Sequence, residues 1–243
     1  TIRDIEILLK DDKISDIGQQ VSGADEEIDA DGALITPGFV DSHTHPVFFG
    51  NRAEEFSQRV HGKSYEEIAN SGGGILSSIQ NIRNVSEDKL FVDSLERVNY
   101  FLSHGTTTIE AKSGYGLSTE DELKSLRVIK RLNEVSKLDI IPTFMGAHAF
   151  PPEYENKHDD YVDLICGEMI PAVVNEKLAE YCDVFCERGY FSVENARKIL
   201  KTAKKHGLKA RLHADEFVDS GVAELAAELG AVSADHLMAV SDS

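Results

Sequence analysis

Two histidines separated by one residue, His43 and His45, are the side chains in this sequence best suited to chemistry. On a β-strand, side chains two residues apart point the same way, so both imidazoles would project together. Neutral imidazole binds Zn, Fe or Ni, and two histidines on one strand form a rigid pair of ligands. The same spacing also arises by chance on surface strands. The preceding segment 36–41 (TPGFVD) and the histidines that follow favour a metal site.

Three further histidines, His148, His213 and His236, stand at or just after the ends of predicted strands. His213 is the natural third ligand, and His236 is placed to hydrogen-bond a metal-bound water or a substrate carbonyl. A lone histidine in an apolar stretch is more often a core residue, but three at successive strand ends favour a shared site. Glu216 follows His213 closely and is a candidate proton shuttle, although a carboxylate at a helix start would have the same sequence context.

The elements that must position these residues alternate between strands and helices after residue 36. The strands are predicted at 106–111, 139–144, 183–186, 208–213 and 231–236, in addition to the one that carries His43. The helices are predicted at 86–104, from 118 past 132, 161–178, 192–207 and 221–229. Residues 33–35 are also expected to be a strand, and residues 1–35 part of a small β-domain of hairpins.

This alternation indicates an α/β fold with a parallel sheet. An open doubly wound sheet would give the same pattern. Histidines at strand ends favour a TIM-type (β/α)₈ barrel instead, because barrel active sites gather at the carboxyl ends of the strands. We therefore expect an incomplete barrel over residues 36–243.

Composition excludes several function classes. The formal charge of −18 disfavours nucleic-acid binding, because an acidic surface repels phosphate backbones. No apolar run approaches the roughly 20 residues needed to cross a bilayer, so no membrane contact is expected. The three cysteines form no C-x-x-C motif, which favours reduced thiols and a cytoplasmic protein.

Five segments resemble the amidohydrolase superfamily and, within it, the imidazolonepropionases, which are ring-opening hydrolases of histidine degradation. They are 37–55 (PGFVDSHTHPVFFGNRAEE), 65–75 (YEEIANSGGGI), 110–117 (EAKSGYGL), 146–152 (GAHAFPP) and 212–216 (LHADE). The resemblance extends over essentially the whole chain, and motifs of this length in five separate loops are specific.

The resemblance implies a role for each candidate residue. The ligands of one divalent ion, Zn or Fe, would be His43, His45 and His213. The catalytic residues would be Glu216 and His236. The substrate-binding residues would be Arg52, Tyr65, Tyr115, His148 and Glu216. Residues 183–187 contain no lysine to carry a bridging carbamate, which favours one metal ion over two.

The implied reaction is hydrolysis of the cyclic amide of 4-imidazolone-5-propanoate to N-formimidoyl-L-glutamate. A metal lowers the pKa of water towards roughly 7, so that water can attack the ring carbonyl. Glu216 would protonate the departing nitrogen, and Arg52 would hold the propionate in a bidentate pair. Two alternatives remain: a cyclic amidine deaminase of the guanine or cytosine type, and an inactive barrel that serves as an assembly module. Arg52 with Tyr115 favours a substrate that carries a carboxylate.

The number of strands is smaller than a full barrel requires. A (β/α)₈ barrel takes about 250 residues by itself, whereas only six strands follow residue 35 here. We therefore expect a C-terminally incomplete barrel without the family's eighth-strand aspartate ligand, and near-zero activity from this chain alone. The resemblance also implies a homodimer with a small-molecule substrate.

Overall fold

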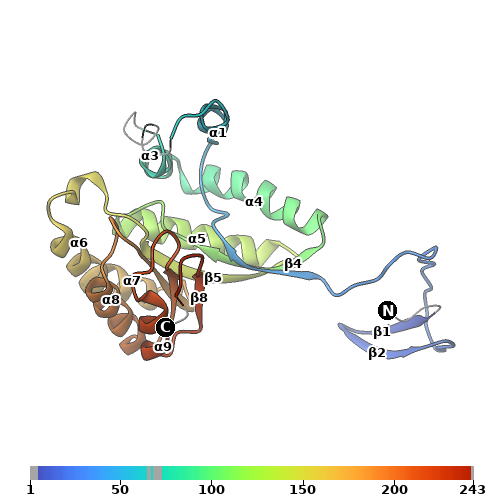
Figure 1. Cartoon of the computed structure of the whole chain (residues 1–243). Coiled ribbons are helices and arrows are strands. Elements are labelled where there is room, and N and C mark those ends of the chain that lie inside the picture. The colour runs from blue at the N-terminus through green and yellow to red at the C-terminus, as the bar shows by residue number, and fades with distance from the viewer. Residues whose placement is uncertain (1–4, 65–66, 68–72, 242–243) are drawn as a thin grey trace. The chain divides into compact units, whose positions relative to one another are not determined.

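The structure is a computed structural model that describes residues 5–64, 67 and 73–241, and it divides into two compact units. Unit 1 is Thr1–Pro37 and unit 2 is Gly38–Ser243 (Figure 1). None of the described helices is long and apolar enough to cross a membrane.

Unit 1 contains an antiparallel hairpin of β1 (Glu6–Lys10) and β2 (Lys13–Gly18). Asp11 adopts a left-handed backbone conformation, with φ of 55°, in the connecting turn. The expected strand at residues 33–35 is not formed. Leu34 and Ile35 are mostly exposed, and no strand among the described residues pairs with this segment to take up its backbone hydrogen bonds.

Unit 2 is built on a six-stranded parallel sheet whose strands follow one another in sequence order. The strands are β3 (Phe39–Thr44), β4 (Thr106–Lys112), β5 (Asp139–Ala147), β6 (Tyr181–Cys186), β7 (Lys209–Ala214) and β8 (Ser233–His236). Pairing of each strand with the next is the topology of a (β/α) barrel, which confirms the predicted fold class.

The sheet curls so strongly that its two edge strands meet through their side chains. His43 on β3 and Asp235 on β8 are joined at 2.8 Å between Nδ1 and Oδ2. In a flat sheet, five steps of about 4.8 Å would separate these strands by roughly 24 Å. The carboxyl ends of the first and sixth strands therefore face each other across a barrel interior.

Helices pack outside the sheet, as Figure 1 shows for α4 (Glu87–Ser103), α5 (Thr119–Val135), α8 (Val193–Lys205) and α9 (Val222–Leu229). The first three begin at a serine cap. Ser86, Ser118 and Ser192 accept hydrogen bonds from the backbone N–H groups of Lys89, Asp121 and Asn195. Each cap satisfies a backbone donor that the helix itself leaves unpaired.

The predicted helix at 161–178 is instead three consecutive pieces. They are α6 (His158–Leu164), a π-helical turn (Ile165–Met169) and α7 (Ile170–Asn175). Pro171 has no N–H to donate to the preceding turn, and a widened turn just before it accommodates this loss. Sequence analysis also missed α1 (Ala53–Val60) and α3 (Ile75–Asn84), which follow the H-x-H strand.

Candidate metal centre and active site

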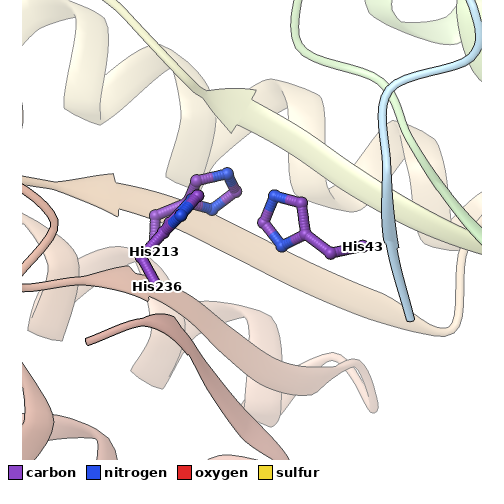
Figure 2. A group of neighbouring side chains, drawn as sticks. All are labelled: His43, His213 and His236. Carbon is purple, nitrogen blue, oxygen red and sulfur yellow. The ribbon is translucent and has the colours of Figure 1, made fainter. Parts of the chain in front are cut away.

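Three histidines from β3, β7 and β8 gather at the carboxyl ends of these strands (Figure 2). Each of His43, His213 and His236 offers a ring nitrogen, and these three atoms lie within 4.8 Å of one another. The ring centroids of His43 and His213 are 4.5 Å apart. The curled sheet thus brings together residues that are almost 200 positions apart in sequence.

His45 lies beside this group as the second member of the H-x-H pair. Its ring centroid is 5.4 Å from that of His43 and 5.6 Å from that of His213. Its Nδ1 atom is buried and has no hydrogen-bond partner among the described residues. Burial lowers the pKa of His45 well below its usual value, and neighbouring histidines lower it further. The ring is therefore neutral, which is the form that binds metals.

Two aspartates orient the other histidines from inside the barrel. Asp183 Oδ1 accepts from the backbone N–H of His213 and lies 3.1 Å from its Nδ1 atom. Asp235 Oδ2 lies 2.8 Å from Nδ1 of His43. A carboxylate that accepts from Nδ1–H leaves Nε2 unprotonated in a neutral imidazole. Both rings therefore present Nε2 as a ligand atom.

These residues fit a divalent metal ion. A buried imidazole nitrogen without a partner, as in His45, is costly unless something binds it. A carboxylate behind a histidine is also the usual partner of a metal-ligating imidazole. The donor set His43, His45 and His213 suits Zn or Fe. His236 is an alternative third ligand, because its ring nitrogen lies within 4.8 Å of those of His43 and His213.

Glu216 and His236 face each other at the edge of the histidine group. Glu216 Oε2 and His236 Nε2 are 3.6 Å apart. Burial lowers the pKa of His236, although the nearby Glu216 raises it. His236 has a φ of 77°, a conformation that is uncommon for any residue except glycine and that often marks functional positions.

Glu216 precedes α9 by several residues, so it is not a helix-start carboxylate. Asp215 takes that role and accepts from the N–H groups of Val222 and Ala223.

Tyr115 and His148 line the next part of the site. Their ring centroids are 5.2 Å apart, and His148 stacks on His45 at 5.0 Å. Gly114 carbonyl oxygen accepts from Nδ1 of His148, and burial lowers the pKa of His148 to about 4. The His148 ring is therefore neutral, with Nε2 as an acceptor.

Arg52 immediately precedes α1, and its guanidinium pairs with Glu55 at 2.6 Å. With 41% of its side chain exposed, it remains accessible to a substrate carboxylate. Tyr65, the remaining predicted substrate-binding residue, lies outside the described residues.

Sequence reasoning missed Asp183, Asp235 and the buried Lys112 that accompanies them. Lys112 Nζ donates to Glu110 at 2.8 Å and to Asp183 at 2.7 Å. Burial lowers the pKa of Lys112, but the two carboxylates outweigh this effect and raise it. The available signal was the charge placed within otherwise apolar predicted strands, because buried charges are rare unless paired.

The chain is similar in sequence to imidazolonepropionases from several bacteria. It is 50% identical over 243 residues to an imidazolonepropionase of Thermoanaerobacter pseudethanolicus, an alignment that spans 99% of this chain and 59% of that protein. It is 55% identical over 217 residues to an imidazolonepropionase of Clostridium tetani, spanning 89% of this chain and 52% of the relative. The chain belongs to the imidazolonepropionase family. It spans between half and three fifths of the length of these two relatives.

Two solved structures have a fold similar to that of this chain. A 5-methylcytosine deaminase from Klebsiella pneumoniae, liganded with phosphonocytosine, matches with a TM-score of 0.65 over 92% of this chain and 52% of the deaminase, at 19% identity. An N-isopropylammelide isopropylaminohydrolase from Burkholderia multivorans matches with a TM-score of 0.63 over 93% of this chain and 55% of that enzyme, at 20% identity. No protein-family model matches the chain.

Proposed function

We propose that the protein hydrolyses 4-imidazolone-5-propanoate to N-formimidoyl-L-glutamate. The main support is the identity of 50% or more to imidazolonepropionases over 99% and 89% of this chain. The geometry supports it, because the histidines, Glu216 and Tyr115 lie around one point of the barrel interior. The low identity to deaminases supports only a common fold.

A divalent ion held by His43, His45 and His213 would activate water and polarise the ring carbonyl. Glu216 is the proton carrier of the chain, since its carboxylate is partly exposed and lies beside His236, whose ring adjoins those of His43 and His213. It accepts a proton from the attacking water and delivers it to the ring nitrogen as the C–N bond breaks. His236, 3.6 Å from Glu216, hydrogen-bonds the oxygen on which negative charge develops.

The substrate has a polar ring and an anionic tail, and the site offers a group for each. His148 presents a neutral Nε2 that can accept from a ring N–H, because its Nδ1 proton is held by Gly114. Arg52 can pair with the propionate in the bidentate manner that a planar guanidinium allows. Glu55 already binds this guanidinium, so it fixes Arg52 in place before the substrate arrives.

We further propose one ion, Zn or Fe, per site. The lysine inside the barrel, Lys112, comes from β4 and is bonded to two carboxylates, and β6 supplies none. A homodimer stays a prediction from the family. A cytoplasmic location is inferred from the proposed catabolic role and the three free cysteines.

The test is turnover of freshly prepared 4-imidazolone-5-propanoate by the protein isolated from the cells that naturally produce it. Loss of ring absorbance should accompany formation of N-formimidoyl-glutamate, identified by mass, and a His213→Ala variant should be inactive. Release of ammonia from cytosine or guanine, without ring opening of the imidazolone, would establish the deaminase alternative. Absence of all of these activities from a metal-loaded protein would favour an inactive barrel.

A further inference from the structure

A cluster of charged side chains lies inside the barrel beside the histidines, and the proposed reaction uses none of them. We call it the interior network, and it consists of Glu110, Lys112, Asp183, Arg211 and Asp235. Four of the five residues are buried, and Asp235 is partly buried. Charged groups in a barrel core cost free energy unless they are fully paired, so their presence calls for a function.

Lys112 is the centre of this network. Its side chain is fully buried, and its ammonium lies 2.8 Å from Glu110 Oε1, 2.7 Å from Asp183 Oδ2 and 3.7 Å from Asp235 Oδ2. An ammonium has three protons, so it can fix the positions of several carboxylates at once. Lys112 thus joins carboxylates from β4, β6 and β8.

Two of these carboxylates end on histidines of the candidate metal centre. Asp183 uses Oδ2 for Lys112 and Oδ1 for the backbone N–H and ring Nδ1 of His213. Asp235 uses Oδ2 for Nδ1 of His43. Asp183 is hydrogen-bonded to the Lys112 ammonium, whereas Asp235 lies 3.7 Å from that ammonium and 3.6 Å from Arg211 Nη2. Lys112 therefore adjoins both of the carboxylates that orient the two imidazoles.

The rest of the network holds the backbone on either side of His43. Arg211 Nη2 donates to the carbonyl oxygen of Ser42 at 2.9 Å. Glu110 Oε2 accepts from the N–H of Thr44 at 3.4 Å, and its own carbonyl oxygen accepts from the Thr44 hydroxyl. The interior network therefore hydrogen-bonds the backbone on both sides of His43 and also orients the His43 ring.

We propose that Lys112 is a positioning residue, which holds Asp183 and Asp235 so that His213 and His43 keep their protons on Nδ1 and present Nε2 to the metal. The proposal concerns the same site as the proposed function and deepens it. It does not depend on which substrate is turned over. Replacing Lys112 removes a hydrogen-bond donor of Asp183 and a neighbouring positive charge of Asp235. Both carboxylates can then shift, and the rings that they orient can rotate or exchange tautomers.

The first measurement needs no substitution. Nitrogen-detected NMR of ¹⁵N-histidine-labelled, metal-free protein reports which ring nitrogen of each histidine carries the proton. The proposal predicts that the neutral form of His43 and of His213 carries its proton on Nδ1. A neutral ring with its proton on Nε2 at either position would overturn the proposal, whatever any variant does.

The second measurement compares Lys112→Met with a control of reduced stability. Met approximates the volume of Lys without its charge. The dissociation constant of the Lys112→Met protein for Zn²⁺, measured by competition with a chelator, should rise by about 10- to 100-fold. A loss of this size is usual when a residue that supports a metal ligand is removed. The rings of His43 and His213 should also lose their single tautomer. Ile199→Ala, in the buried face of α8, should lose stability but keep the wild-type tautomers and Zn²⁺ affinity.

A folded Lys112→Met protein with wild-type tautomers and Zn²⁺ affinity would contradict the proposal. If this variant does not fold, Asp183→Asn decides, because it keeps the shape of the side chain but leaves one acceptor oxygen where Lys112 and His213 now use two. The Lys112 ammonium should attract that oxygen, which turns the amide NH2 towards Nδ1 of His213. An unchanged His213 tautomer in Asp183→Asn would contradict the proposal, and a changed one would support it. Wild-type protein with the predicted tautomers but no turnover of the imidazolone would refute the proposed function alone.

Discussion

At the scale of single residues, Arg52 is the side chain that should determine substrate choice. Removing one partner of a desolvated charge pair typically costs about 2–5 kcal/mol of binding. The exposed guanidinium places Arg52 towards the low end of this range, since solvent screens the pair. Arg52→Ala should therefore raise KM for the propionate substrate by well over tenfold. Steady-state kinetics measure this directly.

The matched control for Arg52 is an imidazolone ring without the carboxylate. Both the wild type and Arg52→Ala should bind this analogue with equal affinity. Equal losses for the two substrates would show that Arg52 only supports the start of α1, through its contact with Glu55.

At this scale, the candidate metal-ligating histidines could be predicted from the sequence, whereas the carboxylates that orient them could not. The H-x-H spacing and the strand-end position of His213 are local patterns, so they were visible in the sequence. The contact between His43 and Asp235 joins residues on opposite edges of the sheet. Only the curvature of the sheet creates it, and no local pattern encodes curvature.

At the scale of elements, the serine caps should each contribute measurably to stability. The Ser118 hydroxyl oxygen accepts from the N–H of Asp121 at the start of α5. Ser118→Ala should reduce the free energy of unfolding by about 1 kcal/mol, because it leaves that donor unpaired. Ser118→Thr should retain most of the stability, since its hydroxyl can accept the same bond and still donate to the carboxylate of Asp121. Urea denaturation of the three proteins measures the difference, and equal midpoints for all three would contradict it.

Caps were predictable because the residues that form them are adjacent in sequence, as in Ser86, Ser118 and Ser192. The break before Pro171 was missed because the apolar spacing of α6 and α7 suits one continuous helix. Residues 33–35 have the composition of a strand, but a strand forms only where a partner accepts its hydrogen bonds.

At the scale of the whole molecule, metal binding should stabilise unit 2, because the ligands come from its first and fifth strands. A ligand at about 100 times its dissociation constant stabilises the folded state by roughly 2.7 kcal/mol. For a chain of this length, that corresponds to roughly 5–10 °C in Tm. Scanning calorimetry with Zn²⁺ and after removal of metal by a chelator measures the shift. The His213→Ala variant should show no such shift, and an equal shift in it would place the metal elsewhere.

The central claim is that the histidines at the carboxyl ends of β3 and β7 hold one divalent ion. Anomalous diffraction from crystals grown with Zn²⁺ tests it most directly. We expect one strong peak about 2.0–2.2 Å from ring nitrogens of His43, His45 and His213. A peak beside His43, His213 and His236 but not beside His45 would mean that His236 replaces His45 as the third ligand. The ring nitrogens of those three residues lie close enough together to allow this. A fully soaked crystal without a peak among these histidines would contradict the metal centre and the hydrolytic function built on it.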